Sequence, residues 1–446
     1  MADASWLIRG GRIIDPGSGV DIVADLRITN GSVSEIGAAG ESLVASNEQE
    51  VDASGLIVSP GLIDAHVHLR VPGQDHKETM ATGTAAAAAG GFTAIATMPN
   101  TVPAIDSPEI VADLLADARA SGVVRVYPIA TISRGRIGER AINFAALVAA
   151  GAIGFSDDGD TTADSDLMRT ALVASRETGR PVMVHCEDKA LAHGAMHEGE
   201  VSARLGLTGI PPEAEEIIIA RDIMLARLTG GWLHVLHVST GAGADLVLAG
   251  RRSGANVTAE VMPHHLTMTD AWVEGDGTLL HTDYPPRQRD VATPDSLAKV
   301  NPPLRTAADT AALLAHLDRG TFDILATDHA PHAGDEKARP FADAPMGMSG
   351  LELALPVLLG LVRAGNLRLV DLIRRLSSEP ARLFGMTGGS LQPGSPADVT
   401  LIDPDCEWVV GRETLRTKSI NTPLLGMTVR GRATLTLVDG IERHRL

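Results

Sequence analysis

The amino-acid sequence predicts an α/β protein built as a (β/α)8 TIM-like barrel, with a small β-sandwich domain formed by both chain ends. Three observations support this prediction. The central part of the chain alternates β-like and helical runs, as consecutive βα units do. Both ends instead carry short runs with a period of two, and neither end is long enough to bury a core alone. We therefore expect residues 1–58 with 386–446 to form the small domain and residues 59–385 the barrel.

The two terminal segments read as short strands separated by turns. Near the amino terminus, Asn30-Gly31 lies between apolar runs and predicts a hairpin. Gly10-Gly11 separates two further β-like runs and is interpreted as another turn. At the carboxyl-terminal end, the runs 398–402, 427–431 and 434–438 alternate in the same way, and Asp439-Gly440 closes the last of them.

Eight β-like runs follow one another in the central segment, which is the number that closes a (β/α)8 barrel. The predicted strands are 62–65, 92–97, 123–130, 152–155, 181–184, 232–236, 256–261 and 322–327. Helical runs separate them, among them 78–89, 108–120, 141–149, 164–177, 212–228 and 307–317. Two further helical runs, 350–362 and 369–376, follow the eighth strand.

The composition excludes several kinds of partner. The formal charge of −18 argues against a nucleic acid or an acidic membrane surface, and any anionic substrate needs locally placed cations. No apolar run is as long as a membrane-spanning helix, and the first five residues do not resemble a signal peptide, so we expect a cytoplasmic protein without a membrane partner. Cys186 and Cys406 lie far apart in sequence and are not expected to form a disulfide.

Two histidines, two residues apart, follow the first predicted barrel strand. Side chains at i and i+2 of an extended chain point to the same side, so the imidazoles of His66 and His68 can converge on one metal ion. Taken alone, the pair is explained equally well as two exposed histidines at a strand end. The interpretation therefore depends on the residues at the ends of the other strands.

Polar residues follow the other predicted strands too, at the carboxyl ends where barrel enzymes carry out their chemistry. They are Asn100, Asp157-Asp158, His185, His237, His264-His265 and Asp328. One such histidine is usually a hydrogen-bonded core residue, but a shared metal site is the simplest common reason for so many. Nitrogen and oxygen ligands suit zinc, with manganese or cobalt as substitutes. His66, His68 and Asp328 could hold one ion. His185 and His237 could hold a second, with a bridging anion between the two.

With these motifs the chain resembles a cyclic amidohydrolase, and in particular a class I dihydroorotase of the amidohydrolase superfamily. The stretches that carry the resemblance are 61–70, 91–94, 98–101, 154–159, 185–188, 237–239, 301–305, 328–332 and 347–352. They cover nearly the whole chain in the expected order. The resemblance implies a zinc-dependent hydrolase acting on C–N bonds in cyclic amides. Its reaction would be the reversible cyclisation of N-carbamoyl-L-aspartate to L-dihydroorotate in pyrimidine biosynthesis.

The resemblance also bears on how two metal ions are bridged. Many relatives, among them hydantoinases, dihydropyrimidinases and allantoinases, use a carboxylated lysine on the fourth strand, but this chain has no lysine between Lys77 and Lys189. Class I dihydroorotases resemble it in using an aspartate, and Asp158 matches by its spacing. Asp157 is the alternative, although neighbouring residues of a strand point in opposite directions. The implied cofactor is a pair of Zn²⁺ ions bridged by Asp158 and hydroxide.

The same resemblance implies roles for residues around the metals. Asp328 would be both a ligand and the general base and acid, taking the proton of the metal-bound hydroxide and delivering it to the leaving nitrogen. Arg70, Asn100 and His332 match the family's contacts to the substrate carboxylate, and Arg70 offers a bidentate fork. The plain alternatives are a surface salt bridge for Arg70 and a turn position for Asn100.

Two more residues, Asn301 and Gly347, are implied to present backbone groups to the substrate ring. Neighbouring polar residues are left out of the site. His329 should point away from Asp328 by strand alternation, and Arg305 is expected to brace a loop. His264 and His265 are not counted among the metal ligands.

The segment between His265 and Asn301 is longer than the resemblance leads us to expect. It contains the irregular stretches 274–277 and 282–289. Long irregular loops are often lids or partner surfaces. We interpret the segment as a mobile cover near the seventh strand.

Two alternative functions stay open. The first is another cyclic amidohydrolase, hydantoinase-like or allantoinase-like, which a panel of substrates distinguishes. The second is a catalytically silent homologue that serves as a scaffold for aspartate transcarbamoylase. A silent homologue should have lost metal ligands, whereas every proposed ligand is present. Besides the small-molecule substrate, a homodimer and a complex with aspartate transcarbamoylase are the partners left open.

Overall fold

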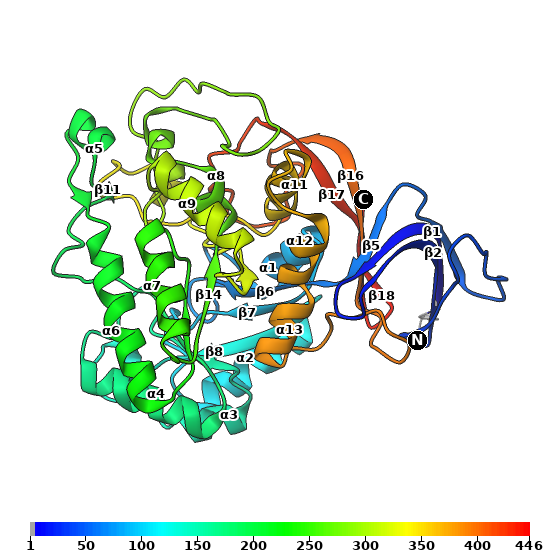
Figure 1. Cartoon of the computed structure of the whole chain (residues 1–446), viewed down its shortest axis with the longest axis horizontal. Coiled ribbons are helices and arrows are strands. Elements are labelled where there is room, and N and C mark those ends of the chain that lie inside the picture. The colour runs from blue at the N-terminus through cyan, green and yellow to red at the C-terminus, as the bar shows by residue number, and fades with distance from the viewer. Residues whose placement is uncertain (1–4) are drawn as a thin grey trace.

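The computed structural model describes residues 5–446, so residues 1–4, part of the amino-terminal segment, lie outside it. Its largest unit is a barrel of eight parallel strands that neighbour one another in chain order (Figure 1). They are β6 (Leu62–Val67), β7 (Phe92–Thr97), β8 (Arg125–Ala130), β9 (Gly154–Phe155), β10 (Val182–Val184), β13 (Leu233–Val235), β14 (Val257–Val261) and β15 (Ile324–Leu325). A bridge between Val67 and His329 joins the last strand's end to the first. The predicted barrel is confirmed.

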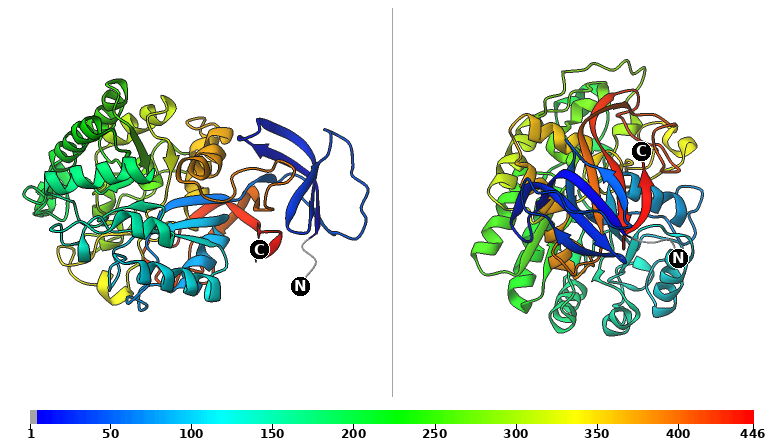
Figure 2. Two further views of the ribbon diagram at one scale, coloured as in Figure 1. Left: turned by 90° about the horizontal axis from the view of Figure 1, so that it is seen from below. Right: turned by 90° about the vertical axis from the view of Figure 1, so that its right-hand side faces the viewer.

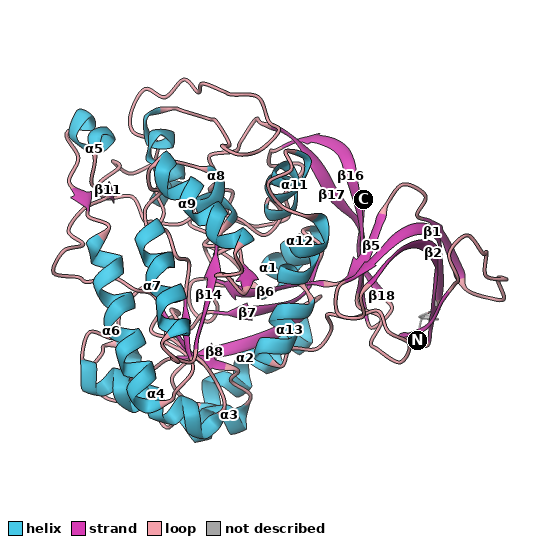
Figure 3. Ribbon diagram, viewed as in Figure 1, coloured by secondary structure: helices cyan, strands magenta, loops and turns pink. Residues whose placement is uncertain are grey.

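Helices cover the outside of the barrel (Figure 3). Those connecting the strands include α1 (Met80–Ala89), α2 (Pro108–Ser121), α3 (Phe144–Ala150), α4 (Ser165–Thr178), α6 (Glu213–Thr229), α7 (Gly241–Arg252) and α9 (Ala307–Asp318), and α11 (Ala354–Arg363), α12 (Leu369–Leu376) and α13 (Ser378–Phe384) follow the last strand. Most begin at a side-chain cap, as α2 does at Ser107 and α4 at Asp164. Such local signals explain why the predicted ranges agree with the structure to within a few residues.

Shorter elements lie in the loops at the barrel's rim. They are β11 (Met196–His197), α5 (Glu200–Leu205), β12 (Gly209–Ile210), α8 (Pro263–Thr267), α10 (Gly334–Lys337) and the 3₁₀ turns η1 (Arg134–Arg136), η2 (Asp270–Glu274) and η3 (Ser296–Ala298). None of these was among the named predictions. Their brief apolar patterns are too short to distinguish from loops.

Strands from both chain ends form one further sheet at the side of the barrel (Figure 2). Its order is β18 (Ile441–Arg445), β17 (Thr428–Val438), β16 (Val399–Val409), β5 (Ile57–Pro60), β1 (Trp6–Asp15), β2 (Val20–Thr29) and β3 (Ser32–Ile36), and β4 (Gln49–Asp52) pairs with β1. The sheet curls around a core shared by the two ends, and Trp6 Nε1 donates to Gly440 O at 2.7 Å. Neither end buries this core alone, as predicted. The exact limits 1–58, 59–385 and 386–446 stay a prediction.

Two of the predicted turns in this sheet are present and one is not. Asn30 and Gly31 have φ values of 50° and 80°, and Asp439 and Gly440 have 51° and 70°, as tight hairpin turns require. Gly10-Gly11, in contrast, was wrongly interpreted as a turn. β1 runs through it, and between the pairs Ile8–Leu26 and Gly11–Ala24 it has one residue more than β2, so Arg9 and Gly10 form a bulge and the chain does not reverse.

The connection between β16 and β17, residues 410–427, leaves the sheet and packs against the barrel. We call it the strap. Its side chains Val410, Leu415, Leu424 and Met427 share one buried apolar cluster with residues after the last barrel strand, among them Met348 and Leu353. The chain-end sheet therefore extends a segment of its own over the rim of the barrel.

The long segment 266–300 is fastened to other elements, and the interpretation as a mobile cover is not supported. The Tyr284 hydroxyl donates to Pro356 O in α11 at 3.0 Å and accepts from Arg430 N in β17 at 2.9 Å. No residue of the segment is among those that line the central cavity at the strand ends. The segment joins the barrel to the chain-end sheet. Within residues 5–446, no helix combines the length and the apolar character needed to span a bilayer.

Candidate active site

The ends of the barrel strands bring the predicted metal ligands together around Asp158. On one side, Asp158 Oδ1 lies 3.8 Å from His66 Nε2 and Oδ2 lies 3.4 Å from His68 Nε2. On the other side, Oδ1 lies 3.8 Å from His185 Nδ1 and 3.5 Å from His237 Nε2. All five side chains are buried. They form two groups of three possible ligands that share Asp158, and within each group the ligand atoms lie within 4.8 Å of one another.

Asp328, which follows β15, joins the first of these groups. Its Oδ1 lies 2.9 Å from His68 Nε2 and 3.5 Å from His66 Nε2. Asp328 and His237 have φ values of 47° and 30°, a conformation that is costly for residues other than glycine. Strain of about 1–3 kcal/mol at such a residue persists only where the surrounding structure enforces it. Backbone strain of this kind is typical of functional sites, and here it occurs at two strand ends.

The chemistry of the cluster fits divalent cations. His66 Nε2 is fully buried and has no hydrogen-bond partner among the described residues, although it faces two carboxylates. Burial opposes ionisation of Asp158 and Asp328, but the histidines around them hold the pKa of both carboxyls below its ordinary value. The cluster thus brings two buried carboxylates together with the ring nitrogens of four histidines, which are ligand types that zinc binds. A cation on either side of Asp158 would satisfy both.

Asp157 does not take part in this cluster. Its Oδ1 accepts hydrogen bonds from Ile132 N at 2.9 Å and Ser133 N at 3.1 Å, and its Oδ2 accepts from Ser133 Oγ at 2.7 Å. Asp157 therefore holds the loop after β8, while Asp158 faces the histidines. Of the two candidates that the sequence left open, the geometry favours Asp158.

Polar residues behind the cluster orient its histidines. Glu260 in β14 accepts from His66 Nδ1 at 2.6 Å and contacts His234 Nε2 at 3.2 Å. His68 Nδ1 lies 2.8 Å from Asn100 Oδ1. Such partners fix the ring orientation of metal-binding histidines. Glu260 was not predicted, although an acidic residue inside an otherwise apolar strand was a signal that could have identified it.

Asn301 has a similar place on the other side of the cluster. Its Nδ2 lies 3.2 Å from His185 Nε2 and donates to Glu187 Oε1 at 2.9 Å, and its Oδ1 is buried without a partner among the described residues. Both Asn100 and Asn301 line the cavity, and each also contacts a histidine of the cluster through its side chain, so their role in substrate binding stays a prediction.

The cluster opens into a cavity of about 370 Å³. Its lining includes His68, Arg70, Asn100, Arg136, Asp158, His185, His237, Asn301, Asp328, His332, Met346 and Gly347. All five predicted substrate-binding residues are among them. Arg136, in η1, was missed because its sequence context resembles an ordinary basic loop. Its Nη1 donates to Asp158 O at 2.7 Å, and it forms an ion pair with Asp160.

Arg70 places a positive charge opposite the cluster. The side chain is 6% exposed, its Nε donates to Pro331 O at 3.1 Å, and its Nη2 lies 3.2 Å from His332 Nε2. Among residues 5–446 no carboxylate lies within salt-bridge distance of it. Burial lowers the pKa of Arg70 to about 10, so the guanidinium is still charged at neutral pH. A buried cation without a counterion is costly, and an anionic ligand would compensate it.

His332 and Gly347 form the wall next to Arg70. His332 Nε2 lies 2.9 Å from Met346 O, and burial together with Arg70 lowers the pKa of His332 to about 2. The imidazole is therefore neutral and donates to this carbonyl. Gly347 has a φ of 134°, and a Cβ there would lie 2.7 Å from Ala330 Cβ. Only glycine fits this position without displacing the wall.

Two buried lysines support this wall from behind. Lys299 Nζ donates to the carbonyl oxygens of Phe341, Ala342 and Ala344 at 2.7–2.9 Å. Lys337 Nζ donates to Gly347 O at 3.1 Å and to Pro345 O at 2.9 Å. Because these amino groups bind backbone carbonyl oxygens of residues 341–347, they hold this loop in a fixed position. The sequence showed nothing that set these two lysines apart.

The residues left out of the site do lie elsewhere. His329 Nδ1 accepts from Gly350 N at 3.1 Å, and the ring is not part of the cavity lining. His265 Nε2 donates to Pro302 O at 3.0 Å. Arg305 is buried and binds Ser239 Oγ at 3.0 Å and Ile210 O at 3.0 Å, so it braces two loops.

Comparison with known proteins agrees with this geometry. The family model for dihydro-orotase-like proteins matches residues 55–242. Curated dihydroorotases match almost end to end. That of Geobacter metallireducens is 44% identical over 97% of this chain and 98% of its own. That of Anaeromyxobacter dehalogenans (strain 2CP-1) is 46% identical over 100% and 98%, and that of Aquifex aeolicus 42% over 97% and 98%.

Solved structures of cyclic amidases share the fold. L-hydantoinase from Arthrobacter aurescens superposes with a TM-score of 0.82 at 26% identity, covering 98% of this chain and 95% of that one. Dihydropyrimidinase from Brevibacillus agri superposes with a TM-score of 0.82 at 25% identity, covering 99% and 95%. Since dihydroorotases match this chain over nearly its full length at more than 40% identity, the chain belongs to the dihydroorotase family.

Proposed function

We propose that the chain is a metal-dependent dihydroorotase that catalyses the reversible cyclisation of N-carbamoyl-L-aspartate to L-dihydroorotate. One observation carries the proposal. The buried Arg70 guanidinium, without a carboxylate partner in the described chain, lines the same cavity as the histidine–aspartate cluster. A substrate with a carboxylate at one end and a ring amide at the other can pair the carboxylate with Arg70 and present the amide to the cluster.

The charge at Arg70 also separates this substrate from other cyclic amides. Dihydroorotate carries a carboxylate on its ring, whereas hydantoin and dihydrouracil do not. An uncharged ring would leave the guanidinium buried and unpaired, which costs several kcal/mol by order of magnitude. Arg70 can bind a carboxylate with two parallel hydrogen bonds, an arrangement that fixes the ring's orientation as well as its affinity.

We propose two Zn²⁺ ions as the cofactor. His66, His68 and Asp328 would hold one, and His185 with His237 the other, with Asp158 shared between them. When bound, the ions lower the pKa of a coordinated water and polarise the carbonyl of the substrate. Glu260 and Asn100 would keep His66 and His68 in the required orientation and tautomer.

We propose Asp328 as the general base and acid. Asp328 and Asp158 both line the cavity, but Asp158 lies between the two pairs of histidines, whereas Asp328 contacts only His66 and His68 among them. Both directions of the reaction need a proton to move between the attacking or leaving oxygen and the amide nitrogen. A carboxylate at the edge of the cluster can accept the proton from the attacking oxygen and then donate it to the amide nitrogen. In the reverse direction it carries the proton from the nitrogen to the leaving oxygen.

The alternative of a hydantoinase-like or allantoinase-like enzyme is less well supported. The centre of the cluster is Asp158, where those relatives use a lysine, and Arg70 would have no role with an uncharged ring. The alternative of a silent scaffold is disfavoured because both groups of possible ligands are complete. A homodimer and a complex with aspartate transcarbamoylase stay predictions, and light scattering with and without the transcarbamoylase tests them.

The purified chain should be assayed on carbamoyl-aspartate and dihydroorotate, with hydantoin and dihydrouracil as matched uncharged rings. Metal content should be measured on the same preparation by mass spectrometry. We expect turnover of the two carboxylate substrates alone and about two zinc ions per chain. Turnover of hydantoin at a comparable kcat/KM would contradict the proposed substrate, and a metal-loaded chain without any turnover would favour the scaffold.

A further inference from the structure

We infer that the strap, residues 410–427, completes the substrate site, and that its Asn421 is a positioning residue for His332 and Gly347. This inference rests on the proposed function, because His332 and Gly347 matter only if the wall beside Arg70 binds the substrate carboxylate. The strap belongs to the chain-end sheet, which otherwise stands apart from the cavity.

Two buried carboxylates fasten the strap to the barrel. Glu352 accepts from Arg416 N at 2.8 Å and from Thr417 N at 3.1 Å. Glu78 accepts from Thr417 Oγ1 at 2.5 Å and from Lys418 N at 3.2 Å. Glu78 is fully buried and Glu352 is 8% exposed. Each carboxyl group binds backbone N–H groups of the strap from a fixed place in the barrel, so the strap's path is closely determined.

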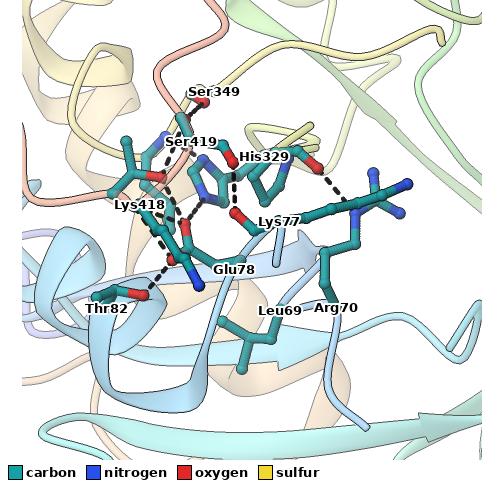
Figure 4. Close-up of polar contacts among 12 residues, drawn as sticks. Leu69, Arg70, Lys77, Glu78, Thr82, His329, Ser349, Lys418 and Ser419 are labelled. Atoms are coloured by element: carbon teal, nitrogen blue, oxygen red, sulfur yellow. Dashed lines mark hydrogen bonds and ion pairs between the residues drawn. The ribbon is translucent and has the colours of Figure 1, made fainter. Parts of the chain in front are cut away.

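Serine hydroxyls continue these contacts toward the cavity (Figure 4). Ser419 Oγ donates to Lys77 O, in the loop that follows Arg70, and Ser349 Oγ donates to Ser419 O at 2.6 Å. In Figure 4, Glu78 lies among Lys418, Thr82 and His329, and the chain from Lys77 leads back to Arg70. The strap is thus joined to the loop that presents the guanidinium and to the loop after the last barrel strand.

Asn421 lies at the end of this series and uses its whole amide group. Its Nδ2 donates to Ala330 O and to Gly347 O, both at 3.0 Å. Its Oδ1 accepts from His332 N at 3.1 Å, and the Ser349 hydroxyl, which donates to Ser419 O, lies 2.9 Å from it. Asn421 is 2% exposed and does not itself line the cavity. It therefore acts through its neighbours, by fixing the two backbone segments that carry His332 and Gly347.

The position of these contacts separates a positioning role from a merely structural one. Asn421 contacts the wall beside Arg70, and none of its hydrogen bonds reaches a residue of the histidine–aspartate cluster. Loss of the amide should therefore loosen the carboxylate site and leave the metal site intact. Loss of a purely structural residue would instead lower metal content, kcat and stability together.

The test compares Asn421→Ala and Asn421→Ser with the wild-type full-length enzyme, and uses Thr414→Ala as the control. Thr414 is in the same strap, but its hydroxyl contacts only the strap and the end of β16, at Val409 O and Gly411 O. The measurements are KM and kcat for carbamoyl-aspartate, the dissociation constant of orotate, zinc per chain and the unfolding midpoint in urea. Orotate probes the wall directly, since it is a planar ring with the same carboxylate and is not hydrolysed.

We expect Asn421→Ala to raise KM and the orotate dissociation constant about tenfold, as the loss of one to two buried hydrogen bonds predicts. The value of kcat should stay within about threefold and zinc content should not change, while Thr414→Ala should match the wild type in all four. Unchanged KM and orotate binding would overturn the inference. A parallel fall in kcat, zinc and stability would do so too. If Asn421→Ala does not fold, Asn421→Ser and Ser349→Ala, which removes the hydroxyl that lies beside Asn421 Oδ1, provide the comparison. An inactive wild-type enzyme would instead contradict the proposed function.

Discussion

The two ends of the cavity are built in different ways. The histidine–aspartate cluster is made by residues at the ends of barrel strands, which the parallel sheet itself holds side by side. The wall beside Arg70 is made by loops, and buried polar groups from distant parts of the chain hold it in place. Lys299 and Lys337 support it from within the barrel, and Asn421 supports it from the strap.

This difference has a physical consequence for how each end responds to change. Strand ends are fixed by many cooperative backbone hydrogen bonds, so a substitution in the cluster alters chemistry more than position. Loop positions depend on a few side-chain hydrogen bonds, each worth about 0.5–1.5 kcal/mol net. The wall should therefore be sensitive to residues that never touch the substrate, and the cluster much less so.

The largest effect should follow from Asp158→Asn. Because both groups of possible ligands share this carboxylate, we expect zinc content to fall by more than half and activity by at least about a thousandfold. Atomic mass spectrometry and initial rates measure both. Asp157→Asn is the matched control and should keep its zinc, since Asp157 binds the loop after β8 and Thr162 rather than the histidines. Equal zinc loss in the two variants would contradict the assignment of Asp158.

A smaller effect, confined to substrate binding, should follow from Arg70→Met. A charge-assisted hydrogen bond contributes about 1.5–3 kcal/mol, so KM for carbamoyl-aspartate should rise about tenfold to a hundredfold while zinc content stays constant. Steady-state kinetics and metal analysis test this. Arg12→Met, which removes an exposed arginine in the chain-end sheet, should have no effect. A change in KM below twofold for Arg70→Met would rule out its role in carboxylate binding.

Glu260→Gln should affect the opposite end of the cavity. The variant keeps the shape of the side chain but removes the charge that orients His66, so zinc affinity should fall about tenfold, as for other partners of metal-binding histidines. Competition with a chelator measures the affinity. KM should change by less than twofold. A rise in KM without weaker zinc binding would show that the two ends are not independent.

The smallest effect on catalysis is expected from Glu352→Gln, which tests how the strap is held. Burial raises the pKa of Glu352 to about 7, above its ordinary value of 4.5, so the folded state binds more protons than the unfolded state between these pH values. The free energy of unfolding of the wild type should therefore fall as pH rises from 4.5 to 7, by at most about 3 kcal/mol from this group. Urea unfolding at pH 5 and pH 7.5 should show a smaller fall for the variant. A steeper fall in the variant would contradict the raised pKa.

Much of the cluster could be predicted from the sequence alone, because its residues follow short apolar strands in a repeating order. The His66-x-His68 pair and the absence of a lysine near Asp158 are local features. Period-two runs at both ends likewise predicted a small β-sandwich domain formed by the two chain ends together. Local hydrogen bonding and hydrophobic periodicity determine these strands, and both depend on residues that are close together in the sequence.

Other features were decided only by the tertiary structure. Gly10 became part of a bulge because β2 pairs with β1 on both sides of it, and segment 266–300 became a brace because Tyr284 meets β17. Glu260, Lys299 and Asn421 acquire their roles from partners between 42 and 194 residues away. Sequence determined which residues lie at the strand ends. Which buried polar groups meet behind them depended on the packing of the whole chain, since a buried hydrogen bond is specified by two segments at once and by neither alone.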